Sequence, residues 1–436
     1  MARTITPIDA HAIMNELVAE AVGLGQVQST DISSFVSCGE LVLSTGMENV
    51  VNALNIVLNR TLVAARPYSA KLKLMQALDT GVYSNRLRKI SYYARWAKPD
   101  GSHNTDLYTN LADGFTAGEN PDNLGTPQST KSQWEQNQPM PLEMNFAGSS
   151  VWQDCITMYD DQLQAAFRSP EEFARFVSGY LTEHGNDIES QKEAWNRMAL
   201  LQKIASTYYY DANSLTSGSV INLTTEFNSR FGTNYQSSEL RSTYLKEFLA
   251  FFVSTFKLVS KFMTERSAER HINFAKQVNS VDYAILRHTP YSKQRVYLYS
   301  PLFTEAEALV LPEIFRPNYL DLDTQYEEVT YWQGISDRAS ISVTPAIIDG
   351  NGEQDAASDA VELDYVVGAI MDEDALMTNF QLERADTTPL EARKHYRNTW
   401  NTFMRNIIDD PSENCVIFIM DDSEVEPDVE PGEGGE

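Results

Sequence analysis

The clearest hydrophobic pattern in the sequence begins at Ser169 and continues to about residue 208. Apolar side chains recur there every three or four positions, as on one face of an α-helix: Phe173, Phe176, Val177, Tyr180, Leu181, Ile188, Trp195, Met198 and Ile204. Ser169 as N-cap, Pro170 in the first turn and Glu172 three positions after the cap form a helix start signal. A helix of about 35–40 residues would be about 55 Å long. The pattern therefore predicts a structural beam.

Other helices are predicted on both sides of this beam. A first helix starts at Pro7, and a short amphipathic helix follows at 47–58, after a looser stretch rich in Ser and Gly. Residues 240–263 have the composition of a mostly buried helix, and Thr304 opens a short helix over 304–315. The stretches 295–300, 339–348 and 363–370 are strand-like.

The C-terminal third is predicted to end in three strands, at 376–384, 395–404 and 414–420. We expect them to form one sheet packed against the long helix. In the last strand, both alternating faces are apolar: Cys415, Ile417 and Ile419 on one, and Val416, Phe418 and Met420 on the other. A strand with two apolar faces is typical of burial on both sides.

Residues 64–148 differ from the rest of the chain. Strand-like pieces flank a stretch at 100–140 that is polar, rich in Gly, Asn and Pro, and without a period. A segment of this length without secondary structure is unusual in a compact domain unless it projects to contact something. Tyr92, Tyr93 and Trp96 lie close together in the flanking part. Contact with a neighbouring subunit is our first interpretation for them, and packing in their own core or stacking on a ligand are alternatives.

Charge changes this picture at the C-terminus. The chain has 436 residues, with 34 Lys and Arg against 61 Asp and Glu, a formal net charge of −27. Eight of the acids lie in the last 16 residues, without a base, which predicts a disordered acidic tail over 421–436. A chain this acidic is not suited to bind nucleic acid tightly. The three cysteines are far apart and indicate buried, reduced thiols. No apolar run is long enough to span a membrane, and no signal peptide is recognised.

No motif in the sequence carries a recognisable chemistry. The six histidines lack metal-ligand spacing, and no Gly-x-Ser-x-Gly, phosphate-binding loop or dinucleotide fingerprint occurs. Acids cluster at 158–162, 371–374 and 420–424, which we interpret as solvated turns at strand ends. The prediction is a protein that is not an enzyme, with no catalytic residue, no cofactor site and no metal site.

The order of these elements resembles the major capsid proteins of tailed bacteriophages with the Hong Kong 97-type fold, and among them most closely those of short-tailed phages. The resemblance lies in residues 41–74 leading into the extended loop, and in 167–183 and 196–211 as the spine helix. Residues 369–380, 395–403 and 415–420 are similar to the closing strands. It covers most of the chain by the order of elements.

The resemblance implies an α+β fold divided along the chain. Its parts would be an N-terminal arm (1–63), an extended β-loop (64–148), a peripheral domain with the spine helix (149–212), an axial domain (213–370), the sheet of the peripheral domain (371–420) and the disordered acidic tail (421–436).

The function implied by the resemblance is self-assembly into an icosahedral or prolate shell around double-stranded DNA. Partners would be further copies, in hexamers and pentamers, and scaffolding and portal proteins. The packaged DNA would be contacted only non-specifically, and no membrane is involved. The protein would belong to the virion and assemble in the host cytoplasm. Two alternatives stay open: an encapsulin-like nanocompartment shell, and an unrelated intracellular glycoside hydrolase with paired acids.

Overall fold

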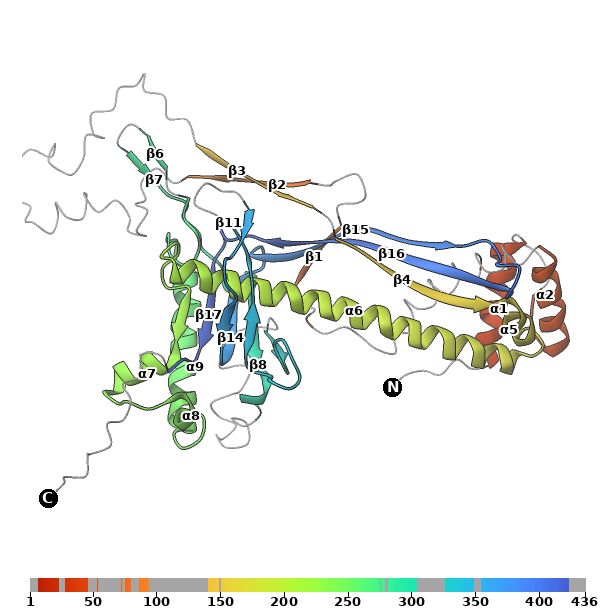
Figure 1. The fold of residues 1–436 in the computed structure, drawn as a ribbon, viewed down its shortest axis with the longest axis horizontal. Coiled ribbons are helices and arrows are strands. Elements are labelled where there is room, and N and C mark those ends of the chain that lie inside the picture. Colours follow the sequence, from red (N-terminus) through yellow and green to blue (C-terminus); the bar gives the residue numbers. More distant parts are fainter. Residues whose placement is uncertain are drawn as a thin grey trace, which may run out of the picture.

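The fold is an elongated arrangement of helices and sheets around one long helix. The computed structural model describes residues 7–22, 28–45, 53, 72, 75–79, 86–93, 140–148, 150–274, 276–278, 281–302, 304, 326–348 and 354–422. Figure 1 shows α6 running from the helices α1 and α2 at one end to a sheet with covering helices at the other. The predicted mixed α+β class is confirmed.

Helix α6 (Pro170–Ala212) is the predicted beam. It has 43 residues, which corresponds to about 65 Å at 1.5 Å per residue. Ser169 is its N-cap, and the Ser169 hydroxyl accepts a hydrogen bond from the backbone N–H of Glu172 at 3.1 Å. The helix continues through Gly185 without a break. The prediction is therefore confirmed at the start, and the helix extends a few residues beyond the predicted end.

The Ser169→Ala variant is expected to lower the free energy of unfolding by about 1 kcal/mol, because one N–H of the first turn loses its acceptor. Ser190→Ala is the matched control, since Ser190 is exposed in the helix interior, where alanine is the better helix former. Chemical denaturation followed by circular dichroism measures both. Equal midpoints for Ser169→Ala and the native chain would contradict the capping role.

A four-stranded sheet lies alongside α6 (Figure 1). Its order is β1 (Gln76–Asp79), β15 (Leu376–Thr387), β16 (Tyr396–Asp409) and β4 (Ser150–Tyr159). β15 and β16 pair antiparallel, and so do β16 and β4, whereas β1 pairs parallel to β15. The strands predicted at 376–384 and 395–404 are confirmed, and both are longer than expected.

A separate five-stranded sheet occupies the other end of the molecule. Its order is β5 (Val220–Asn222), β17 (Cys415–Ile419), β14 (Val366–Asp372), β8 (Gln294–Tyr299) and β9 (Tyr326–Val329). The prediction that 414–420 joins the same sheet as 376–384 and 395–404 is therefore wrong.

The two apolar faces of β17 explain its position. Its residues are buried along its whole length, which confirms the predicted burial on both sides. The Cys415 thiol lies 3.4 Å from the Thr207 hydroxyl of α6, while Phe418 contacts Phe252 and Phe256 of α9 (Leu245–Met263). Only a central strand with a helix against each face satisfies this pattern. The predicted buried helix at 240–263 corresponds to α9 and is confirmed.

The remaining elements of this end are short. The helices are α7 (Leu223–Phe231), α8 (Ser237–Leu240) and the 3-10 turn η2 (Tyr291–Lys293). Three small two-stranded sheets pair β6 (Lys276–Val278) with β7 (Val281–Tyr283), β10 (Ile341–Val343) with β13 (Val361–Leu363), and β11 (Ala346–Ile348) with β12 (Gln354–Ala356).

The N-terminal end is built from α1 (Pro7–Ala21), α2 (Ile32–Ser44) and α5 (Asp160–Ala166). The helix start at Pro7 is confirmed, but the stretch expected to be loose forms α2. Asp31 and Ser34 form a capping box there, and Gly39 allows close approach, since a Cβ at this position would lie 3.2 Å from Cβ of Phe167. The predicted helices at 47–58 and 304–315 lie outside the described residues, apart from Ala53 and Thr304.

Two main hydrophobic cores lie at opposite ends of α6. The first joins α1, α2 and α5 to the start of α6 around Phe35 and Phe173. The second joins the five-stranded sheet, α7, α8 and α9 to the C-terminal part of α6. Cys38 is buried in the first and Cys415 in the second, and neither forms a disulfide, as predicted, whereas Cys155 is half-buried.

Candidate functional site: the base of a projecting hairpin

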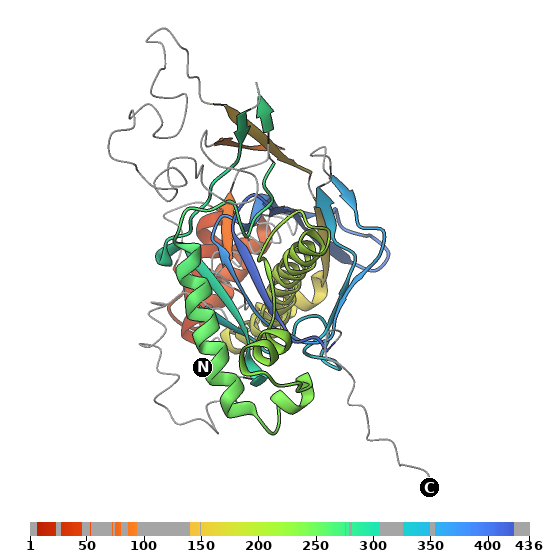
Figure 2. The same cartoon turned by 90° about the vertical axis from the view of Figure 1, so that its left-hand side faces the viewer.

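The hairpin of β2 (Arg86–Tyr92) and β3 (Pro141–Ala147) stands apart from both large sheets. Its strands pair antiparallel from Arg86 opposite Ala147 to Tyr92 opposite Pro141. Figures 1 and 2 place it on one side of the body, next to the small β6–β7 hairpin. The strand-like flanks predicted for the loop are thus present, and the polar stretch at 100–139 lies outside the described residues.

The two faces of β2 have different surroundings. Arg88, Ile90 and Tyr92 are exposed, and the Arg88 guanidinium pairs with Glu143 of β3 at 2.6 Å. Tyr92 is 61% exposed and Ile90 49%. Tyr93 is half-buried, and burial raises the pKa of its hydroxyl. Trp96 lies outside the described residues, so the three aromatics predicted at a subunit contact are only partly placed.

The hairpin lacks an apolar anchor. None of its described side chains belongs to a hydrophobic core of the molecule. A two-stranded hairpin by itself is marginally stable in water. Among the described residues, the contacts that attach it to the body are polar.

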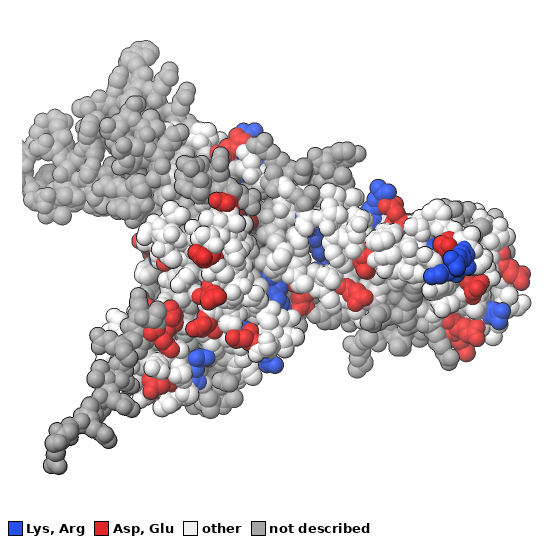
Figure 3. Space-filling model, viewed as in Figure 1, with Lys and Arg blue, Asp and Glu red and all other residues white. Residues whose placement is uncertain are grey.

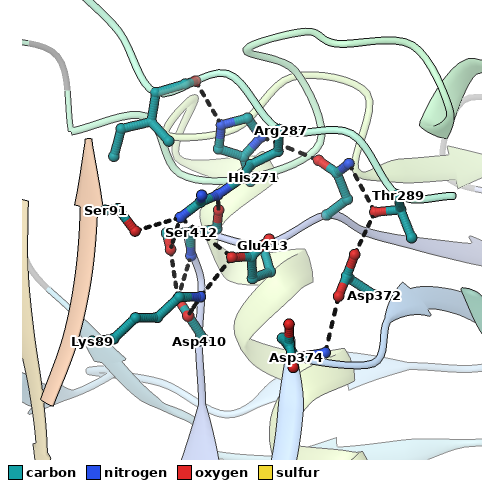
Figure 4. Close-up of polar contacts among 12 residues, drawn as sticks. Lys89, Ser91, His271, Arg287, Thr289, Asp372, Asp374, Asp410, Ser412 and Glu413 are labelled. Atoms are coloured by element: carbon teal, nitrogen blue, oxygen red, sulfur yellow. Dashed lines mark hydrogen bonds and ion pairs between the residues drawn. The ribbon is translucent and has the colours of Figure 1, made fainter. Parts of the chain in front are cut away.

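The polar contacts converge on the connection between β16 and β17 (Figure 4). The Lys89 ammonium of β2 binds the carboxylates of Asp410 and Glu413, the latter at 2.5 Å. The Arg287 guanidinium donates to the Ser91 hydroxyl at 2.7 Å and pairs with Glu413 at 3.2 Å. We call residues 409–414 with Lys89, Ser91, Lys203 and Arg287 the joint.

The joint also holds the long helix. The Lys203 ammonium of α6 donates to the Asp409 carboxylate at 2.9 Å and to the Asp410 carbonyl at 2.8 Å. The Asp410 carboxylate is fully buried and accepts the backbone N–H and the hydroxyl of Ser412, at 2.9 and 2.7 Å. Arg287 donates through Nε to the Ser412 carbonyl at 2.9 Å. One short connection thus fixes the spine helix, the hairpin and the segment around Arg287.

A chain of neutral and acidic groups continues from the joint into the five-stranded sheet. The Asn414 amide donates to the Thr289 hydroxyl at 3.1 Å, and Thr289 donates to the Asp372 carboxylate at 2.7 Å. Nδ1 of His271 lies 3.2 Å from Oδ1 of Asn414. Burial raises the pKa of Asp372 and lowers that of His271, which favours the neutral imidazole.

Charge at the joint is balanced, with the cations Lys89, Lys203 and Arg287 facing the acids Asp409, Asp410 and Glu413. Burial by itself would lower the pKa of Lys203, but the neighbouring Asp409, Cys415 and Asp410 together outweigh it, and the pKa lies above its ordinary value. Burial raises the pKa of Glu413, although Lys89 and Arg287 pull it down. The paired charges of this arrangement hold three elements together, namely the hairpin, the spine helix and the segment around Arg287.

The prediction of solvated turns is wrong for one acid in each of the first two clusters, whereas Asp161 of 158–162 is exposed. Asp160, from 158–162, is buried with Arg397 Nε at 3.4 Å, and Asp372, from 371–374, is buried as described above. Within the described part of the chain, no group of three or more side chains is placed to hold a metal ion. The described helices include none that is long and apolar enough to cross a membrane.

The first residues of the predicted tail are also held. Asn222 exchanges two hydrogen bonds with the backbone of Asp421, at 3.0 and 3.2 Å. The Asp422 carboxylate accepts the N–H and the hydroxyl of Ser237 at the start of α8, at 2.6 and 2.8 Å. The prediction of a disordered tail from 421 onward is wrong for these two residues, because Asp421 is bound to Asn222 and Asp422 caps the start of α8. Residues 423–436 lie outside the described part.

Ending the chain after Asp422 is expected to leave the melting temperature unchanged. Ending it after Met420 should lower the free energy of unfolding by about 1 kcal/mol, because α8 loses its capping carboxylate. Asp422→Ala in the full chain should reproduce that loss. Differential scanning calorimetry separates the cases, and identical melting of both truncations would contradict the cap.

Comparison with known proteins finds similarity in structure only. No family model and no curated protein matches the sequence. The structure is similar to the capsid structure of Staphylococcus phage Andhra, with 11% identity over 81% of this chain and 85% of that one, at a TM-score of 0.48. It is also similar to the mature capsid of bacteriophage PhiM1, with 9% identity, 81% and 87% coverage and a TM-score of 0.40. A third similar structure is the capsid of cyanophage P-SCSP1u, with 8% identity over 80% of this chain and 86% of that one, at a TM-score of 0.40.

Proposed function

We propose that this protein is the major capsid protein of a tailed phage with the Hong Kong 97-type fold, assembling into a closed icosahedral or prolate shell around double-stranded DNA. The observation that carries the proposal is the hairpin, which has exposed apolar side chains on its outer face and no core of its own. The order of elements adds support: N-terminal helices, a projecting hairpin, a long helix with a sheet alongside, and a second sheet with helices.

The division of the chain that we propose follows the two sheets. An arm at 1–63 and an extended loop at 64–148 precede a peripheral domain at 149–212, which α6 and β4 support. The axial domain would comprise 213–370. Residues 371–409 return to the sheet beside the spine helix, and 415–420 belong with the axial sheet because β17 pairs with β14 and β5.

The contacts between subunits would use exposed apolar positions on the hairpin and on the sheet. Val151 and Tyr159 of β4 and Trp400 of β16 are 54%, 44% and 40% exposed. Together with Ile90 and Tyr92 they provide surfaces that a second copy can cover. Each contact is modest, but closed symmetry repeats it, so that the shell is stable. The partners are further copies in hexamers and pentamers, with scaffolding and portal proteins.

The net charge of −27 is compatible with a shell that encloses DNA and contacts it only non-specifically. On the face shown in Figure 3, acidic and basic side chains of the described residues are interspersed. Specific or tight binding of a polyanion would need a basic stripe. The protein would reside in the virion and assemble in the host cytoplasm.

The experiment is electron microscopy and native mass spectrometry of the purified full chain over a range of concentrations. Hexamers, pentamers or closed shells are the expected species. A chain that is monomeric at every concentration and cleaves glycosides would favour the hydrolase alternative. Particles that enclose an enzyme cargo and exclude DNA would favour the nanocompartment.

A double variant, Ile90→Asp with Tyr92→Asp, tests the hairpin contact. We expect assembly to weaken by a factor of about ten or more, which corresponds to about 1.4 kcal/mol, while circular dichroism stays native. The control is Ser358→Asp, at an exposed position outside the hairpin. If the double variant forms normal shells, the outer face of the hairpin is not part of the contact between subunits.

A further inference from the structure

We propose that the β2–β3 hairpin is a rigid arm mounted on the body by charge, and that Lys89 is the residue that sets its direction. The arm can change direction as a unit while the body stays folded. The inference concerns the single subunit and does not depend on shell assembly.

The first step is the lack of apolar attachment. Of the hairpin side chains that the structure describes, Ser91 alone is buried, and it is polar. Leu87, Leu142, Met144 and Phe146 are half-buried and belong to no core cluster of the described residues. Hydrophobic burial is the dominant favourable contribution to folded structure, and the hairpin takes little part in it. Its direction is therefore decided by directional polar contacts.

The second step is the uneven burial of the joint. The side chains of Lys203 and Asp409 are 2% and 15% exposed, and those of Asp410 and Glu413 are 0% and 11% exposed. Lys89 is 23% exposed, more than any of these four. The acids belong to the body, and we call Asp410 and Glu413 the socket. Lys89 pairs with both and is more exposed than either.

The third step is that the socket keeps its shape without the arm. Asp410 still accepts two hydrogen bonds from Ser412, and Glu413 still pairs with Arg287. The pair of Lys203 with Asp409 is made without the hairpin. Removing Lys89 therefore takes away both described ion pairs between arm and body without removing a support of the body. The hydrogen bond from Arg287 to the Ser91 hydroxyl is then the described polar contact that still holds the arm.

The fourth step is the stiffness of the arm itself. Seven residue pairs join its strands, and the Tyr93 N–H donates to the Met140 carbonyl at 3.0 Å. These contacts are all internal to the arm. Lys89 sits between two carboxylates, and this two-point contact fixes one orientation where a single ion pair would allow several.

The experiment measures the distance between arm and body by double electron–electron resonance. Spin labels are placed at Asn145→Cys on the outer face of β3 and at Lys246→Cys in the exposed first turn of α9, in a Cys155→Ser background. The protein is kept below the concentration at which it associates. The native chain should give one narrow distance. Lys89→Met should roughly double the width of the distribution or shift its maximum, because several arm directions become populated.

Two matched variants test whether the effect comes from the position of Lys89 or from the loss of any cation in the hairpin. Lys89→Arg keeps the cation and should keep the narrow distance. Arg88→Met removes the neighbouring cation on the opposite face of the same strand and should also leave the distance unchanged. Near-ultraviolet circular dichroism of Lys89→Met should match the native spectrum, because the body's cores are untouched.

An unchanged narrow distance in Lys89→Met would overturn the inference. So would loss of the native near-ultraviolet spectrum in that variant, since the arm and the body would then not be separable. If the distance distribution of Lys89→Met broadens while this variant still forms normal shells, the inference is upheld. The same result would count against the proposed role of the hairpin in assembly.

Discussion

Lys203→Met is expected to lower the free energy of unfolding by about 3–5 kcal/mol, the usual cost of removing one partner of a buried ion pair. The Lys203 side chain is 2% exposed in the middle of the second core. Its loss leaves the Asp409 carboxylate without its cation and the Asp410 carbonyl without its donor. Methionine fills a similar volume, so the expected loss is electrostatic and not a cavity effect. Urea denaturation at pH 7 measures it.

Two further variants test this cause. Lys192→Met removes a cation from the same helix, but its pair with Glu189 is partly exposed, so the expected change is about 0–1 kcal/mol. Lys203→Met combined with Asp409→Leu should recover part of the loss, because no uncompensated carboxylate remains. If the double variant is less stable than Lys203→Met alone, the ion pair is not the source of the effect.

Gly368→Ala is expected to destabilise the five-stranded sheet by about 2–3 kcal/mol through overpacking. A Cβ at this position would lie 2.7 Å from the Tyr297 carbonyl oxygen and 3.0 Å from a methyl of Leu298. The carbonyl belongs to the adjacent strand β8, so backbone must move to make room. Strand β14 is central in the sheet, with an irregular register beside Gly368, and neither neighbour can shift outward freely.

Gly334→Ala is the control for this substitution. The nearest atom to a Cβ there is the Ser336 hydroxyl at 3.8 Å, an ordinary contact, so the expected change is within about 0.5 kcal/mol. Thermal melting of the two variants should differ clearly. Similar melting temperatures would mean that β14 and β8 separate more easily than their packing suggests.

The elements that could be predicted from the sequence are those with local causes. The start of α6 at Ser169 depends on a side chain and a backbone N–H three residues apart. The burial of β17 depends on its own alternation of apolar residues. Its place in a sheet depends on β14 and on β5, whose residues lie some 50 and 200 positions earlier in the chain, and nothing within 414–420 encodes that choice.

The joint could not be found from the sequence for the same reason. The signal near it is the acid-rich connection of Asp409 and Asp410 before β17, which resembles a turn at the surface. Its partners Lys89, Lys203 and Arg287 come from three distant elements. A carboxylate at a strand end is solvated or buried depending on such partners. For this reason the interpretation as solvated turns was wrong for Asp160 and Asp372.

Helix α2 was missed because small polar residues favour both loops and helix starts. Asp31 and Ser34 together satisfy the first turn, and Phe35, Cys38 and Val42 then fall on one buried face. The Ser and Gly content of this stretch indicates a loop, whereas the spacing of its buried residues is that of a helix. Gly39, which weakens an isolated helix, permits the contact with Phe167.

The placement of the two cores has a consequence for synthesis on the ribosome. The first core draws on residues from Ala10 to Phe176, so it can form when less than half of the chain has emerged. The second draws on residues from Leu72 to Met420 and requires β17, which is translated nearly last. At about 5–20 residues per second, the remaining stretch takes some tens of seconds at the slow end. During that interval the nascent chain would carry a folded N-terminal end and an unfinished joint, so the arm would acquire its fixed direction only when translation is almost complete.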